Sequence, residues 1–318
     1  MNTRREILAA GIGAATLNQC ARRPPADPAT VAIVRAPAYD DSLYEIMRRL
    51  VSQLRPDVRG RRVVLKPNLV EFDPGTTINT HPRVVHAALE AFRALGAAEV
   101  RIAEGPGHRR VTLDLAEAAG YFQVIPKFED LFTDLNVDEV AAVDLRKPFS
   151  KLRRLYLPRT ALGADLLVSM PKLKTHHWVG ATLSMKNFFG LVPGGVYGWP
   201  KNVLHWAGIN ESIADLHRAF PRQFAIVDGI TGMEGNGPIQ GTPKSAGVLV
   251  AGADLVAVDA TCCRIMRIDP ERIQYLKLAE SQAQTSEAGA RQIGEAITAV
   301  QTEFALLPQF QGIRLARG

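Results

Sequence analysis

Lysines and neutral hydrogen-bond donors gather in one stretch of this chain, from Asp165 to Gly195. A short apolar run, Leu166 to Met170, opens the stretch and is typical of a buried strand. Pro171 is expected to close that strand, because proline has no N–H to give to a sheet. The polar residues that follow are Lys172, Lys174, Thr175, His176, His177, Thr182, Ser184, Lys186 and Asn187. Cations and amides just past a strand suit the binding of a small anion, and the plainer alternative is a solvated basic loop.

Further predicted strands also end in polar residues. The strands at 62–65, 100–103 and 224–227 are followed by Lys66 and Asn68, by Glu104, and by Asp228 and then Glu234. Glycine or proline beside each position lets the backbone turn sharply and come close to a ligand. Because the carboxyl ends of parallel strands share one edge of a sheet, these side chains are expected to face a single crevice with the lysine-rich stretch.

These residues predict a site in which lysines bind a carboxylate or phosphate, and in which carboxylates hold a divalent metal or act as acid and base. The candidate catalytic residues are Lys172, Lys174, His176, Asp228 and Glu234. The candidate ligand-binding residues are Lys66, Asn68, Glu104, Lys186 and Asn187. The candidate metal ligands are Glu104, Asp228, Glu234 and His176. A lysine among other lysines also has a lowered pKa and can serve as a base or a nucleophile.

Taken singly, several of these residues have plainer interpretations. Glu104 would cap the next helix or pair with a lysine, and Asp228 would belong to an ordinary turn. His81 stands before a helix proline and is expected to cap that helix rather than to bind a ligand. His176 and His177 are adjacent, so in an extended chain they point to different sides and only one is expected to serve the site.

Two glycine-rich segments flank the candidate residues. The segment 230–238 lacks the G-K-[ST] of a phosphate loop, and it is predicted to be a tightly turned or mobile loop that presents Glu234 and Asn236. The segment 194–206, which carries His205, is predicted to be a lid. The chain has no G-x-S-x-G, no H-E-x-x-H and no G-x-G-x-x-G after its first strand, so serine hydrolase, zincin and dinucleotide-binding functions lack support.

Strands alternate with helices along the chain. Strands are predicted at 31–34, 62–65, 100–103, 140–145, 166–170, 224–227, 248–251 and 297–304. Helices are predicted at 41–54, 83–95, 112–121, 209–220, 254–268 and 271–282. This order predicts an α/β fold with a mostly parallel, doubly wound sheet and helices on both faces. Residues 30–318 are expected to form a single domain, with a boundary between two lobes near 150–165 as the alternative.

The composition is that of an ordinary globular protein, with 47% hydrophobic and 22% charged residues. The formal net charge of +6 is mild and fits an anionic small molecule better than a nucleic acid, so no nucleic-acid partner is expected. The cysteines are Cys20, Cys262 and Cys263, without a C-x-x-C, so no built-in iron–sulfur cluster or zinc ribbon is expected. Cys262 and Cys263 lie in an apolar helical pattern and are expected to be core residues.

Residues 1–28 have the pattern of a leader with a Pro-rich link. Arg4 and Arg5 precede the apolar run Ile7 to Leu17, which is too short to span a membrane. The arginine pair predicts export to the periplasm by a twin-arginine route, and no transmembrane span is expected in the mature chain. Cys20 is a candidate lipid anchor with poor support, because Gln19 replaces the small residue that such sites need. A frayed amino-terminal helix is the alternative to a leader.

Seven ordered motifs in this chain resemble the DUF362 family, a domain of unknown function. They are LKPN at 65–68, HP at 81–82, EGPG at 104–107, MPKLKTH at 170–176, SMKNFFGLVPG at 184–194, IVDGITGMEGNGP at 226–238 and AGADLVAVDA at 251–260. The resemblance covers residues 31–280 and implies a fold and a site rather than a reaction. Many relatives carry an added ferredoxin-type cysteine cluster, which this chain lacks. The site also has a more distant likeness to the lactate racemases, from which no nickel cofactor is carried over.

The sequence therefore predicts an exported DUF362-family enzyme that acts on a small anionic ligand at a lysine-rich site, with a divalent metal as a candidate cofactor. One alternative is a non-catalytic carrier of a metal or an anionic cofactor, or an accessory protein of a redox system. Another is a partner of a membrane redox complex, which would need an exposed apolar patch. The reaction, the substrate and the oligomeric state do not follow from the residues.

Overall fold

A computed structural model describes residues 29–108, 111–281 and 290–316. The leader predicted at 1–28, with its arginine pair and Cys20, lies outside these residues. The strands are β1 (Thr30–Arg35), β2 (Arg62–Pro67), β3 (Glu99–Glu104), β4 (Phe132–Asp134), β5 (Val140–Asp144), β6 (Arg154–Pro158), β7 (Leu166–Met170), β8 (Lys172–His176), β9 (Gly180–Thr182), β10 (Gln223–Glu234), β11 (Thr242–Gly252) and β12 (Arg291–Gly294).

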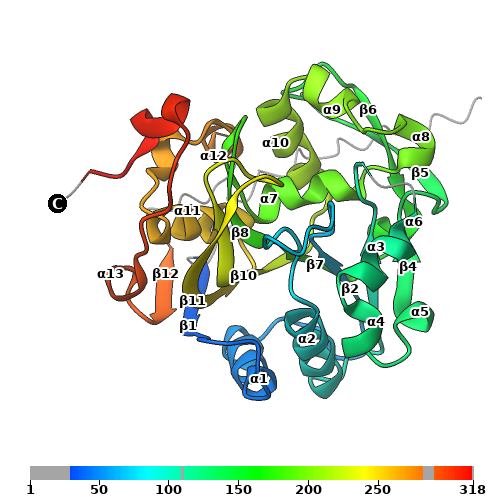
Figure 1. Ribbon diagram of the computed structural model, residues 1–318. Helices are drawn as coiled ribbons and strands as arrows, with labels where there is room; N and C mark the ends of the chain where they lie inside the picture. Colours follow the sequence, from blue (N-terminus) through cyan, green and yellow to red (C-terminus); the bar gives the residue numbers. More distant parts are fainter. Residues whose placement is uncertain (1–28, 109–110, 282–289, 317–318) are drawn as a thin grey trace, which may run out of the picture.

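The helices are distributed along the whole described chain (Figure 1). They are α1 (Leu43–Leu54), α2 (Pro82–Ala94), α3 (Thr112–Ala118), α4 (Tyr121–Val124), α5 (Phe128–Leu131), α6 (Arg159–Leu162), α7 (Ser184–Asn187), α8 (Gly194–Tyr197), α9 (Val203–Trp206), α10 (Ile209–Ala219), α11 (Leu255–Ile265), α12 (Gln274–Glu280) and α13 (Ile297–Val300). Short 3₁₀ helices are η1 (Phe188–Leu191), η2 (Pro270–Arg272) and η4 (Pro308–Ile313).

One large sheet has the strand order β12-β1-β11-β10-β7-β2-β3-β4, with β8 and β9 attached beside β10. β10, β7, β2, β3 and β4 are parallel to one another, and β12 is parallel to β1. β11 runs antiparallel to both of its neighbours, β1 and β10. The predicted α/β fold with a mostly parallel sheet is therefore confirmed, and the strand predicted at 248–251 belongs to the antiparallel strand β11.

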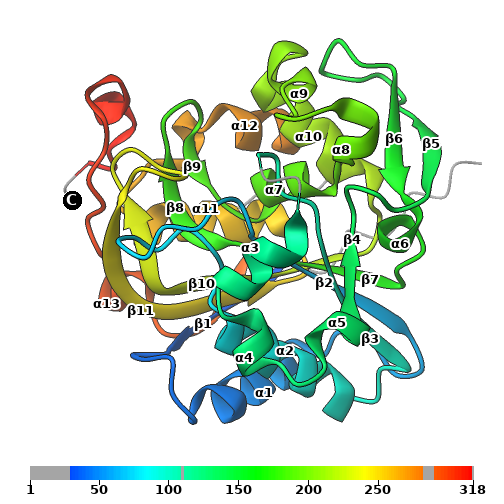
Figure 2. The same ribbon diagram turned by 45° about the vertical axis from the view of Figure 1, so that its right-hand side comes forward.

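Helices cover both faces of this sheet (Figures 1 and 2). α1 and α2 lie on one face, and α7, α10 and α11 lie on the other, so each face has its own hydrophobic core. In α1 the buried residues recur at helical spacing: Leu43, Met47, Leu50 and Val51. In α11 Asp254 caps the first turn by accepting the N–H of Ala257. Cys262 and Cys263 are fully buried there, which confirms them as core residues.

Two sequence predictions on strands need correction. The strand predicted at 297–304 is wrong, because Ile297 to Val300 forms the single helical turn α13, and the edge strand is β12 instead. Val300 and Phe304 are buried from this segment, but the backbone N–H groups of Thr302 and Phe304 donate to the carbonyls of Ile265 and Met266 and not to a strand of the sheet. The strand predicted at 140–145 exists as β5, but it pairs with β6 in a separate two-stranded sheet.

The glycine-rich segment after Asp228 is not a loop over most of its length. β10 continues to Glu234, with an irregular register between Gly229 and Thr231. A Cβ on Gly232 would lie 2.5 Å from the carbonyl oxygen of Leu173, so this glycine lets β8 approach β10 closely. Close packing against β8 therefore allows β10 to continue through residues 229–234, although their glycine content is typical of a loop.

The lysine-rich stretch is likewise a strand rather than a solvated loop. β7 ends at Met170 before Pro171, as expected, but the chain resumes at once as β8, whose residues are all buried. β7 pairs with the first part of β10, and β8 pairs with β10 from Asp228 onward. None of the helices in the described part of the chain is long and apolar enough to cross a membrane.

Candidate functional site

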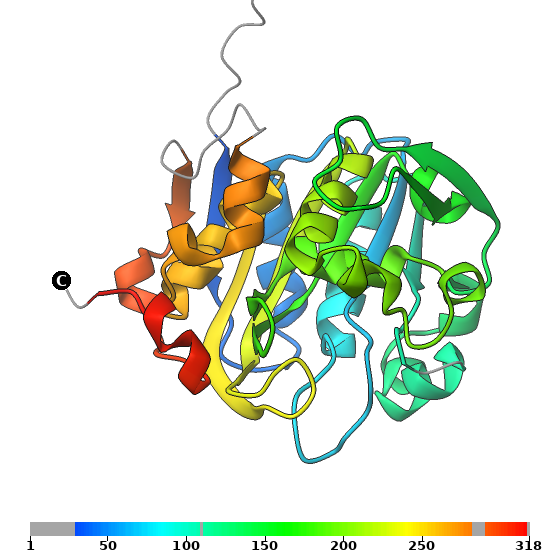
Figure 3. The same cartoon turned by 90° about the horizontal axis from the view of Figure 1, so that it is seen from above.

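A cavity of about 360 Å³ lies where β2, β3 and β8 end, and segments from distant parts of the chain close it. Figure 3 shows the segment after β2 beside the segment after β10, where Thr76 Oγ1 donates to the carbonyl of Gly241 (2.7 Å). The side chains that line the cavity include Asn68, Glu104, His108, Lys174, His176, His177, Trp178, Lys186, Asn187, Phe189, Lys201, Asn202 and His205. The cavity is therefore rich in cations and imidazoles.

Lys174 enters this cavity from β8 without a carboxylate partner. Its fully buried Nζ donates to Asn68 Oδ1 (2.7 Å) and to the carbonyl oxygens of Ile78 (2.9 Å) and Pro238 (3.2 Å). Burial, together with the nearby lysine charges, holds the pKa of Lys174 well below its ordinary value. The neutral acceptors fix the amine in place and leave its charge uncompensated.

Lys66 and Glu104 form a buried ion pair at the cavity floor, joining the ends of β2 and β3. Lys66 Nζ also donates to Asn187 Oδ1 (3.1 Å), whereas Glu104 Oε2 is buried without a hydrogen-bond partner in the described residues. Burial lowers the pKa of Lys66 and raises the pKa of Glu104, and the pair opposes both changes. A Cβ on Gly190 would collide with both charged groups, so this position needs glycine.

Two further lysines face the same space. Lys186 lies on α7 with Nζ 3.7 Å from the centroid of the Phe189 ring. Lys201 is buried, and its Nζ donates to the carbonyl of Gly105 (2.6 Å). Burial and the charge of Lys66 lower the pKa of Lys186 to about 7. Burial also lowers the pKa of Lys201 to about 7, against the opposing effect of Glu104.

His176 is a neutral hydrogen-bond donor toward the cavity. Its Nδ1 accepts the backbone N–H of Trp178 (3.0 Å), which places the ring proton on Nε2. Burial, followed by the charge of Lys186, holds the pKa of His176 well below its ordinary value, so the ring is uncharged at neutral pH. His205 packs edge-on against the rings of Trp178 and Phe189, and burial lowers its pKa to about 4.

α7, the helix that carries Lys186 and Asn187, is anchored from the neighbouring helix α11. Asp259 accepts the backbone N–H groups of Ser184 (2.8 Å) and Met185 (3.1 Å) and also the hydroxyl of Ser184 (2.5 Å). Burial raises the pKa of Asp259 to about 7. This single carboxyl group therefore fixes the start of the short helix that presents Lys186.

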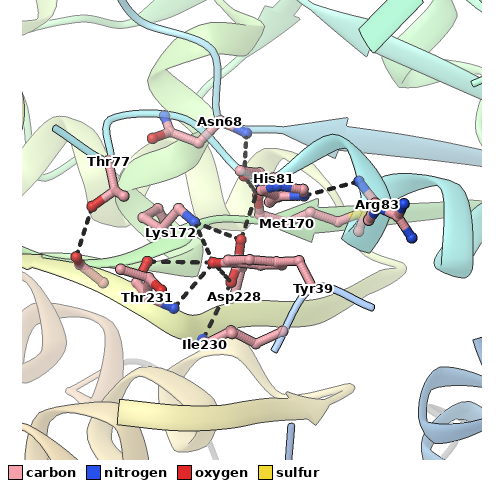
Figure 4. Close-up of polar contacts among 12 residues, drawn as sticks. Tyr39, Asn68, Thr77, His81, Arg83, Met170, Lys172, Asp228, Ile230 and Thr231 are labelled. Atoms are coloured by element: carbon pink, nitrogen blue, oxygen red, sulfur yellow. Dashed lines mark hydrogen bonds and ion pairs between the residues drawn. The ribbon is translucent and has the colours of Figure 1, made fainter. Parts of the chain in front are cut away.

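Lys172 and Asp228 belong to a different, closed network of polar contacts (Figure 4). Neither residue lines the cavity. Lys172 Nζ pairs with Asp228 Oδ2 (2.7 Å) and donates to the hydroxyl of Tyr39 (3.0 Å), which itself donates to Asp228 Oδ1 (2.9 Å). The backbone N–H of His81 also donates to Asp228 (3.0 Å), and the His81 ring stacks on Tyr39. His81 caps α2 through Nδ1, as expected.

The remaining candidate, Glu234, lies apart from both the cavity and the network of Lys172. Glu234 pairs with Lys244 of β11 (3.4 Å) and accepts the backbone N–H of Ala305 (2.8 Å), and it does not line the cavity. Glu104, Asp228, Glu234 and His176 thus have separate partners, and within the described ranges no three His, Cys, Asp or Glu side chains are placed to hold a metal ion. The predicted metal site does not fit this arrangement.

The structure thus brings together Lys66, Asn68, Glu104, Lys174, His176, Lys186 and Asn187, and it separates Lys172, Asp228 and Glu234 from them. Lys201, Trp178 and Tyr39 were not singled out from the sequence. Lys201 belongs to the segment 194–206 that is predicted to be a lid, and it lies four residues before His205. This position was the sequence feature that could have indicated a role for Lys201 in the site. Tyr39 had no signal, because its partner Asp228 lies far along the chain.

Fold and cavity together define an α/β protein with a cation-lined cavity at the carboxyl edge of its sheet. The sequence matches the family described as domain of unknown function, DUF362, over residues 63–264, and the chain belongs to this family. A thylakoid-associated protein of Synechocystis sp. is 30% identical over 268 residues, covering 79% of this chain and 78% of that protein.

Two solved structures resemble the fold at low sequence identity. The lactate racemase apoprotein from Thermoanaerobacterium thermosaccharolyticum is 12% identical with a TM-score of 0.48, and it is matched over 75% of this chain and 57% of its own. A structural-genomics target from Thermotoga maritima is 16% identical with a TM-score of 0.38, matched over 77% of this chain and 60% of its own. This chain thus spans less than two thirds of either structure.

Proposed function

We propose that this protein is an enzyme that binds a small anion, a carboxylate or a phosphate, in the cavity formed by the ends of β2, β3 and β8. One observation carries the proposal: Lys174, Lys186 and Lys201 line the cavity, and none of them forms an ion pair with a carboxylate of the described residues. Buried cations without partners are costly, and an anionic ligand is the group that would compensate them.

Two features support an enzyme over a carrier. Lys186 and Lys201 have a pKa of about 7, so both protonation states are available near neutral pH, as acid–base catalysis requires. His176 offers a neutral N–H toward the same space, which suits the stabilisation of developing negative charge on an oxygen. A carrier needs only ligands and gains nothing from lysines poised between two charge states.

Isothermal titration with oxalate and with inorganic phosphate tests the binding step, with Lys186→Met as the altered protein. Loss of one charged contact is expected to weaken binding by about 1.5–3 kcal/mol, or about tenfold to a hundredfold. Lys244→Met is the matched control, because Lys244 pairs with Glu234 outside the cavity. The proposal fails if neither anion binds, or if both variants bind equally well.

We also propose that residues 1–28 direct export by a twin-arginine route. Arg4-Arg5 followed by the apolar run 7–17 supports this proposal. A fusion of residues 1–28 to a reporter that is active only after export in a folded state is expected to be exported, and replacement of Arg4 and Arg5 by lysine is expected to abolish export. Export that persists after that replacement contradicts the proposed route.

A further inference from the structure

The lysines around the carboxyl edge of the sheet differ in how their amines are satisfied. The amines of Lys66 and Lys174 each donate to three acceptors. The amine of Lys172 donates to Asp228 and to Tyr39. The amine of Lys201 donates to the carbonyl of Gly105. The amine of Lys186 has no hydrogen-bond acceptor among the described residues, and its one contact is the face of the Phe189 ring. Lys186 therefore has an amine in the cavity that packs on the Phe189 ring and that no hydrogen bond of the described residues fixes.

The surroundings of Lys186 favour a neutral amine with a free lone pair. The charge that acts on it is that of Lys66, and Lys186 in turn lowers the pKa values of Lys174, His176 and His205. Burial, followed by the charge of Lys66, disfavours the ammonium form and lowers the pKa of Lys186 to about 7. A desolvated lysine beside other cations is the arrangement that makes an amine nucleophilic.

We propose that Lys186 forms a covalent imine with the carbonyl group of a small anionic carbonyl compound, of the 2-oxo acid class, bound in this cavity. The inference rests on the proposed function, because other cations of the cavity must hold the anionic group. Lys201 is suited to that role, because its Nζ uses one N–H on Gly105 and a carboxylate bound beside it favours the ammonium form, which has two further N–H groups to donate.

The step balances with groups of the cavity. The neutral Nζ of Lys186 attacks the carbonyl carbon, a C–N bond forms, and the electron pair of the C=O bond moves to oxygen. One proton of the nitrogen is transferred to this oxygen to give the neutral carbinolamine, and the second leaves with the hydroxyl group as water in the next step. His176 lines the cavity and carries its ring proton on Nε2, so it can donate a hydrogen bond to that oxygen as its charge develops. The carbinolamine then loses water as the nitrogen lone pair forms the C=N bond, so carbonyl and amine give imine and water.

Reductive trapping tests this step directly. The full chain is incubated with pyruvate and sodium borohydride near pH 8, and the reduced adduct is measured by intact mass and located by peptide mapping. An amine with a pKa of about 7 is largely neutral there, whereas an ordinary lysine of pKa about 10.4 is not, so the adduct is expected on Lys186 at about tenfold the level on exposed Lys277. Lactate, which has no carbonyl, is expected to give none.

The variants separate this inference from the proposed function. Lys186→Arg keeps the positive charge but cannot form the imine, so anion binding by titration should persist while the adduct disappears. Binding of oxalate without any adduct from pyruvate overturns the imine and leaves the proposed function standing. An adduct spread evenly over the exposed lysines overturns it as well. Failure of the wild type to bind any anion overturns the proposed function itself.

Discussion

Lys172 and Lys174 are two residues apart on β8 and project to the same face of the strand, yet their surroundings differ. Lys172 has a carboxylate partner in Asp228 and a hydroxyl partner in Tyr39, and this network is closed. Lys174 has neutral acceptors and faces the cavity. A buried lysine whose charge is compensated within the protein has a structural role, whereas one that lacks a counter-charge is suited to meet a ligand.

Removal of the counter-charge of Lys172 is expected to have the largest effect. Asp228→Asn leaves Lys172 buried without a carboxylate and is expected to lower the free energy of unfolding by about 3–5 kcal/mol. Urea denaturation of wild type and variant measures the difference. The double variant Lys172→Met/Asp228→Leu removes both charges and should recover most of the loss. A stable Asp228→Asn protein that no longer binds anions would place Asp228 in the cavity after all.

The contribution of Lys186 to the free energy of unfolding is expected to change with pH in the opposite direction to that of a lysine whose pKa is raised by a salt bridge. Lys186 has a pKa of about 7 in the folded protein and an ordinary lysine pKa of about 10.4 when unfolded. Between these values the unfolded chain binds more protons, so the free energy of unfolding rises with pH, by at most about 1.4 kcal/mol per pH unit for this lysine. Below about pH 7 both states are protonated and the contribution is constant.

Urea denaturation of wild type and Lys186→Met at several pH values between about 7 and 9 isolates this contribution. The variant is expected to show the smaller rise, because it lacks the titrating amine. Anion binding should weaken over the same range, since the lysine loses its charge. If the free energy of unfolding rises equally with pH in wild type and in Lys186→Met, Lys186 does not titrate with a lowered pKa in the folded protein. The contrast between the cavity and the network of Lys172 would then disappear.

Tyr39→Phe tests whether the closed network is independent of the cavity. The hydroxyl donates to Asp228 and accepts from Lys172 and from the backbone N–H of Thr231 (3.0 Å), so its loss is expected to cost about 1–2 kcal/mol of stability. Anion affinity should stay unchanged, because Tyr39 does not line the cavity. Tyr156→Phe, at an exposed position of β6, is the matched control. A loss of affinity in Tyr39→Phe alone would show that the two regions are coupled.

Much of this arrangement follows from local patterns in the sequence. Apolar runs, a proline at a helix start and polar residues after strands were enough to predict the parallel sheet and to place Lys66, Glu104, Lys174 and Lys186 near one edge of it. The choice of partner was not predictable, because Lys172 meets Asp228 only through β-sheet pairing between residues far apart in sequence. For the same reason the sequence could not separate the closed network from the cavity.

The two candidate glutamates provide the mildest test of the same contrast. Glu234 forms a partly exposed pair with Lys244, so Glu234→Gln is expected to change the free energy of unfolding by less than about 1 kcal/mol and to leave anion affinity unchanged. Glu104→Gln removes the counter-charge of fully buried Lys66 and should cost several times more. Denaturation and titration of both variants give the comparison. A more than tenfold loss of anion affinity in Glu234→Gln would mean that Glu234 contributes to the cavity, contrary to its contacts with Lys244 and Ala305.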